Sequence, residues 1–176
     1  MGEPDIIRQA LEAIQGDDLD AARTALLAAL TEHPERIDLV HSLSIIELQS
    51  GRPEQALDLV EKGAAVLRER NGPGDAKMIP LLLLSAGAAC EEMGDPEHAL
   101  EAYEQILTLE PGHPLATQGK GHLLLAWGQL DAGLETLQSV VDAQDDDPRF
   151  LEATAKLIAG VRAFLADDLH PRNFID

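Results

Sequence analysis

Apolar residues recur along this chain every three or four positions, the spacing that places them on one side of an α-helix. A small and a large apolar residue are paired at this spacing three times, at Ala22 and Leu26, at Ala56 and Val60, and at Ala99 and Tyr103. A turn precedes each pair: Gly16-Asp17-Asp18, Gly51-Arg52-Pro53 and Gly94-Asp95-Pro96. No run alternates apolar and polar residues as a β-strand does, so the pattern predicts an all-α protein.

The pairs return in a unit of about 34 residues, the length of a repeat that consists of two helices joined by a turn. We expect about four repeats and a C-terminal capping helix in one domain, residues 1–169, with a tail at 170–176. The repeats are expected at about 3–36, 37–70, 76–113 and 114–147, and the capping helix at 148–167. Asp147 is a suitable N-cap for that last helix. Its expected apolar side is Phe150, Leu151, Ala155, Ile158, Val161, Phe164 and Leu165.

The third repeat is the most regular. Its characteristic positions are Leu83, Gly87, Gly94-Asp95, Ala99, Tyr103 and Pro111. At this spacing they resemble the tetratricopeptide repeat family, and the resemblance covers about residues 3–147. The second repeat departs from the family pattern because it lacks the closing proline. The fourth has Gly133 where the family usually has alanine. The resemblance implies antiparallel helix pairs stacked into a right-handed superhelical solenoid, whose first helices line a concave surface that binds peptides, helices or other subunits.

The candidate partner-binding residues are those on the first helices that do not face their own partner helix. By helical spacing they are Ile7, Leu11, Ile14, His41, Ile45, Leu48, Leu81, Leu84, Ala88, Leu115, Gln118, His122 and Leu125. The set is mostly apolar, and exposed apolar surface favours binding of an amphipathic helix or an apolar peptide. The alternative is that a neighbouring repeat or the last helix covers these side chains.

The polar members of this set carry little further chemistry. The co-chaperone branch of the family clamps a terminal carboxylate with Lys, Arg and Asn, but the corresponding positions here hold Ile, His, Leu and Gln. His41 and His122 are either donors to a bound peptide and pH sensors, or ordinary polar residues. Neither belongs to a pair of histidines four residues apart, so no metal site is predicted.

Composition indicates which residues form the core. Aromatic residues are only 3% of the chain, so alanine and leucine must form the core, with Tyr103 and Trp127 expected to pack in it. Cys90 lies among small apolar residues and is expected to be a buried, inert thiol.

The charge of the chain restricts its partners. There are 32 acidic residues against 13 Lys and Arg, a net charge of −19. This charge disfavours nucleic acid and anionic membranes. It serves either solubility or attraction of a basic partner.

No catalytic or cofactor-binding arrangement is evident. The glycines of Asn71-Gly72-Pro73-Gly74 lack the strand and the lysine of a phosphate-binding loop. The N-terminal residues lack the features of a signal peptide, and no apolar run is long enough to span a bilayer. We therefore expect a cytoplasmic adaptor that is not an enzyme, binds a basic or amphipathic protein segment and uses no cofactor. Two alternatives remain: the N-terminal interaction or regulatory domain of a larger enzyme, and a self-assembly module that forms homo-oligomers.

Overall fold

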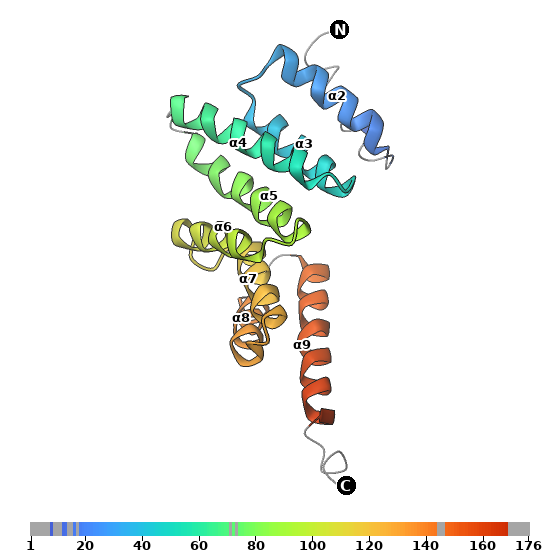
Figure 1. Ribbon diagram of the computed structural model, residues 1–176, viewed down its shortest axis with the longest axis vertical. Coiled ribbons are helices and arrows are strands. Elements are labelled where there is room, and N and C mark those ends of the chain that lie inside the picture. The colour runs from blue at the N-terminus through green and yellow to red at the C-terminus, as the bar shows by residue number, and fades with distance from the viewer. Residues whose placement is uncertain are drawn as a thin grey trace. The chain divides into compact units, whose positions relative to one another are not determined.

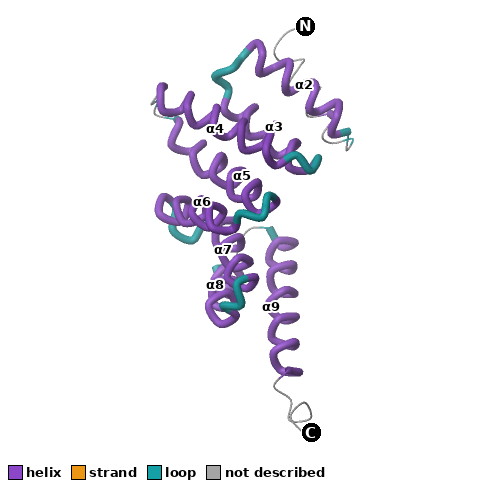
Figure 2. Tube along the Cα trace, in the orientation of Figure 1, coloured by secondary structure: helices purple, strands orange, loops and turns teal. Residues whose placement is uncertain are grey.

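The protein is helical throughout the part that the structure describes. The computed structural model describes residues 8, 12, 13, 16, 18–70, 72, 74–143 and 147–168. Its elements are α2 (Leu19–Glu32), α3 (Ile37–Gln49), α4 (Pro53–Arg70), the short 3₁₀ helix η1 (Asp75–Lys77), α5 (Met78–Glu92), α6 (Pro96–Leu109), α7 (Pro114–Ala126), α8 (Leu130–Asp142) and α9 (Pro148–Asp168) (Figures 1 and 2). The prediction of an all-α chain is confirmed. The tail at 170–176 and most of the first expected helix lie outside the described residues.

The helices group into two compact units, Met1–Leu109 and Glu110–Asp176. In the first unit, α3 pairs with α4 and α5 pairs with α6, while α2 packs against α3 and α4 packs against α5. In the second unit, α7 pairs with α8, and α9 packs against α8. Each unit thus contains helical hairpins of the expected kind.

The same turn closes the first helix of three hairpins. It uses Gly51, Gly94 and Gly128, whose φ angles are 67°, 74° and 74°. This left-handed conformation costs glycine little, because glycine has no Cβ to clash. After each glycine, a backbone N–H donates to the carbonyl five residues earlier: Arg52 to Glu47 at 2.9 Å, Asp95 to Cys90 at 2.8 Å and Gln129 to Leu124 at 2.9 Å. These bonds satisfy carbonyls that the helix end would otherwise leave free, so the sequence stops each helix at a defined residue.

Paired helices approach closely where a glycine faces a large side chain. A Cβ added to Gly87 on α5 would lie 2.6 Å from the Tyr103 ring of α6. A Cβ on Gly121 of α7 would lie 2.7 Å from Leu137 of α8. Tyr103 and Leu137 are buried, as the repeat pattern predicts. The absent side chain therefore sets the distance between the two helices of a pair.

A buried carboxylate joins α2 to the hairpin of α3 and α4. Glu47 on α3 is buried, and its Oε1 accepts a hydrogen bond from Arg23 Nε of α2 at 2.7 Å. Its Oε2 accepts from Nε of Arg52, the residue just before α4. Two arginines thus compensate the desolvated carboxylate, as a buried charge requires.

The last helix, α9, begins at the expected residue, but fewer of its apolar residues are packed than the sequence predicts. Asp147 Oδ1 accepts the backbone N–H of Arg149 at 2.9 Å, which confirms its capping role. Ile158 is buried, and Val161 and Leu165 are half-buried against α8. Phe164, however, is 64% exposed, because it lies outside the side of α9 that faces α8. Its predicted place among the packed residues is wrong.

Trp127 also differs from the expectation of a core aromatic. It is the C-cap residue of α7 and is 38% exposed. A residue at the cap has left the regular helix, so the helical spacing that places Leu123 in the core does not apply to it. Cys90, by contrast, is buried as predicted, and burial raises the pKa of its thiol.

The close approach of α5 and α6 gives a stability prediction. Gly87→Ala should lower the free energy of unfolding by about 1–3 kcal/mol, because the new methyl group overlaps the Tyr103 ring. Gly160→Ala on exposed α9 is the matched control, since no atom lies within 4 Å of the added Cβ. It should raise stability by up to about 1 kcal/mol through helix propensity. Urea unfolding measures both changes; a neutral Gly87→Ala would contradict the packing described.

Candidate functional site

Two first helices, α3 and α5, contact each other directly in the first unit. Ser44 Oγ on α3 lies 2.9 Å from Ser85 Oγ on α5, and both serines are buried. His41 Nδ1 lies 3.2 Å from the same Ser85 Oγ. These polar contacts hold the two helices side by side. Because Ser85 is buried, its hydroxyl is not accessible as a nucleophile, and the contact with His41 serves packing.

Six of the predicted binding residues lie on these two contacting helices. Ile45 is 37% exposed, and the other five are half-buried. We call this set the α3–α5 face: His41, Ile45 and Leu48 on α3, with Leu81, Leu84 and Ala88 on α5. Each member retains accessible surface, and five of the six are apolar. The face can therefore contact apolar groups of a partner.

His41 is the only titratable member of the α3–α5 face. It is half-buried, and this desolvation lowers the pKa of its imidazole below the usual 6.5. The ring is consequently neutral at physiological pH, where it can accept or donate a hydrogen bond with Ser85. A neutral His41 keeps the face uncharged.

The four predicted residues on α7 have different surroundings. Leu115 is 50% exposed, and His122 is exposed as well. Gln118 Nε2 donates to Thr154 Oγ1 of α9 at 2.8 Å, so the last helix covers this side chain. Leu125 packs against α8, where a Cβ on Gly133 would lie 2.7 Å from it. Ile7, Leu11 and Ile14 lie outside the described residues.

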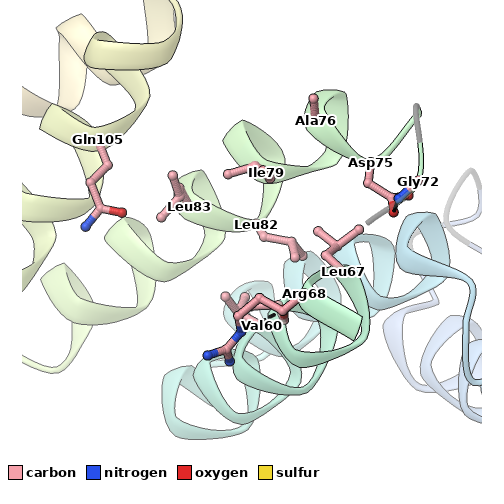
Figure 3. A pocket seen from close by; sticks show the side chains of 11 residues that line it. Val60, Leu67, Arg68, Gly72, Asp75, Ala76, Ile79, Leu82, Leu83 and Gln105 are labelled. Atoms are coloured by element: carbon pink, nitrogen blue, oxygen red, sulfur yellow. Dashed lines mark hydrogen bonds between the residues drawn. The ribbon is translucent and has the colours of Figure 1, made fainter. Parts of the chain in front are cut away.

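A cavity between α4, α5 and α6 was not anticipated from the sequence. Its volume is about 440 Å3, and mainly aliphatic side chains line it. In Figure 3, Leu67 of α4 and Leu82 of α5 face the space, while Arg68 and Gln105 extend at its edge. The lining residues are Val60, Ala64, Leu67, Arg68, Gly72, Asp75, Ala76, Ile79, Leu82, Leu83 and Gln105.

Two sequence signals could have indicated this cavity. The family pattern has tryptophan four residues before the glycine of the first helix, but here Leu83 stands four residues before Gly87. The smaller side chain leaves room that an indole would fill. In addition, α4 continues to Arg70 and has 18 residues, whereas α6 has 14 and α8 has 13.

Two further kinds of feature, a metal-binding cluster and a membrane-spanning helix, are absent from the described residues. Within them, no three His, Cys, Asp or Glu side chains gather closely enough to hold a metal ion. None of the described helices combines the length and apolar character needed to cross a bilayer.

Comparison with known proteins is consistent with this architecture. Models of the tetratricopeptide repeat match residues 7–76 and residues 92–157. Cellulose synthase operon protein C of Pseudomonas fluorescens (strain SBW25) is 27% identical over 145 residues, which are 82% of this chain. The same region is 11% of that protein, so this chain spans only a small part of its relative's length.

Solved structures share the fold at low sequence identity. Yeast Tom70 superposes with a TM-score of 0.73 and 14% identity, covering 94% of this chain and 34% of that chain. The O-GlcNAc transferase of Thermobaculum terrenum gives a TM-score of 0.66 and 20% identity, covering 82% of this chain and 26% of the transferase. The repeated turns, the glycine contacts and the two matching models lead to one conclusion: the chain belongs to the tetratricopeptide repeat family.

Proposed function

We propose that this protein is an interaction module whose α3–α5 face binds the apolar side of a partner helix or an extended peptide. Membership of the repeat family supports a role as a protein–protein interaction scaffold. The observation that carries the finer proposal is the exposed Ile45 beside half-buried Leu81 and Leu84 on two contacting helices. Covering these side chains removes apolar surface from water, which favours binding.

The charge of the chain supports a basic partner. With a net charge of −19, the surface attracts cations over a distance limited by the screening length of the salt. An apolar segment flanked by Lys or Arg therefore matches both the face and its surroundings. Association of such a partner should weaken as salt is added, because screening acts on the charges and not on the apolar contact.

A second reading places this module within a longer protein. The chain covers 11% of its curated relative and 26% of a transferase with the same fold. On that reading the repeats position a partner or substrate for chemistry that occurs elsewhere. The role of the α3–α5 face is the same in both cases, because on either reading the module contributes binding.

Photo-crosslinking from Ile45 tests the proposed face. A benzoylphenylalanine at this position should link to one partner, and Leu84→Asp in the same chain should abolish the product, because a carboxylate opposes burial of the face. The matched control places the crosslinker at Asp58, an exposed position on α4. Equal products from Ile45 and Asp58, or products that survive Leu84→Asp, would overturn the proposal. A product made of two copies of this chain would identify self-assembly.

The neutrality of His41 predicts a pH dependence of stability. Its pKa is lowered in the folded state, so the unfolded chain takes up the proton first as the pH falls below 6.5. The contribution of His41 to the free energy of unfolding is therefore complete above pH 6.5. It decreases below that pH, by at most about 1.4 kcal/mol per pH unit.

Urea unfolding of the wild type and His41→Gln at about pH 7.5 and pH 5.5 isolates this effect. The wild type should lose more stability between the two conditions than His41→Gln does. Other groups, including His98, whose pKa is raised by Asp95, are common to both proteins and cancel in the comparison. Equal losses would show that burial does not hold His41 neutral.

A further inference from the structure

The cavity of the first unit lies beside a position of the repeat pattern where the family's motif has a larger side chain than this chain has. Leu83 stands at the tryptophan position of the pattern and is only half-buried. Leu82 is buried next to Gly63 of α4, where an added Cβ would lie only 3.2 Å from it, so α4 and α5 are close together on that side. Ile79, one turn earlier on α5, is 38% exposed into the same region. The packing of α4 and α6 on α5 is thus incomplete at this place.

The cavity has the size and the lining of a small-molecule site. Its volume of about 440 Å3 falls within the range of about 300–1,000 Å3 that is common for ligand pockets. Every apolar lining side chain is aliphatic, from valine, leucine, isoleucine or alanine. No aromatic ring lines it to stack on a planar ligand, so the walls suit a flexible hydrocarbon chain.

One positive charge at the edge of the cavity is not compensated. Arg68 Nε donates to the backbone carbonyl of Ala64 at 3.2 Å, which leaves both terminal nitrogens of the guanidinium available. Among the residues that the structure describes, no carboxylate pairs with Arg68. Gln105 of α6 also lines the cavity and has an amide N–H donor (Figure 3). An anionic group is therefore favoured here, even in an acidic chain.

The carboxylate that also lines the cavity is already neutralised. Asp75 accepts hydrogen bonds from the guanidinium of Arg70 and, at 2.6 Å, from the backbone N–H of Gly72. These partners satisfy both of its oxygens. Asp75 consequently does not oppose an anion at the opposite edge, and Arg68 remains the charge that a ligand would meet.

We propose that this cavity binds an aliphatic carboxylate. The hydrocarbon chain lies among Val60, Leu67 and Leu82, and its carboxylate accepts hydrogen bonds from the two terminal nitrogens of Arg68. The site is separate from the α3–α5 face and does not depend on the function proposed for that face.

Calorimetric titration with decanoate, kept below its micelle concentration, tests whether Arg68 binds the carboxylate. The wild type should bind decanoate at least about tenfold more tightly than decanol, since a charge-assisted hydrogen bond is lost with the alcohol. Arg68→Gln should remove that preference. Lys62→Gln is the matched control, because Lys62 lies on the same helix, pairs with Asp58 and does not line the cavity. Equal binding of decanoate and decanol, or unchanged preference in Arg68→Gln, would overturn the proposal.

A second variant tests the place of the hydrocarbon chain. Leu83→Trp restores the family residue and fills the cavity, so it should abolish decanoate binding without lowering the melting temperature. This variant is expected to fold, because the pattern of the family accommodates tryptophan there. Wild-type decanoate affinity in a folded Leu83→Trp protein would show that the ligand binds elsewhere, which would also overturn the proposal.

Discussion

The contact between a glycine and a large side chain is the constraint on which two of the helix pairs, α5 with α6 and α7 with α8, depend. At Gly87 and Tyr103, and again at Gly121 and Leu137, the helices are so close that no Cβ could be accommodated without movement. Interiors pack densely, so this distance also determines how the next helix rests on the pair. A side chain added at either glycine would push the two helices apart and displace the elements packed against them.

Packing of the helices leaves part of α3 and of α5 accessible. Ile45 on α3 is exposed, and Leu81 and Leu84 on α5 are half-buried. Between the helices, Ser44 and Ser85 form a short polar contact in place of a bulky apolar one. Small hydroxyl groups let the two helices approach each other there. The accessibility of the α3–α5 face is thus a consequence of how the core is built.

The proposed carboxylate site lies beside Leu83, at a position where the family's motif has tryptophan, and along α4, which is longer than the other second helices. The charged residues also differ in whether they have partners. Glu47 is fully compensated by Arg23 and Arg52 inside the fold, whereas Arg68 has no carboxylate partner among the described residues. The paired charges stabilise the fold, whereas the charge of Arg68 is the one that the proposed carboxylate site uses.

Local chemistry in the sequence determined the helices and their ends. The small and large pairs predicted the buried positions Ala22, Leu26 and Tyr103, and Asp147 capped α9 as its carboxylate should. These features depend on neighbours within a few residues, so the sequence contains the necessary information. The same spacing placed Phe164 and Trp127 among packed residues, where the structure exposes them. Periodicity identifies an apolar side but does not show how much of it another helix covers.

Contacts between distant residues were decided only by the tertiary structure. Two contacts of α7 depend on how α8 and α9 pack against it. They are the hydrogen bond from Gln118 to Thr154 and the packing of Leu125 against Gly133. The cavity beside Leu83 depends likewise on three helices at once. The sequence by itself determined the repeat, its turns and its acidic charge. Which apolar side chains stay accessible was decided by helix packing, because burial is a property of the space between elements and not of any one of them.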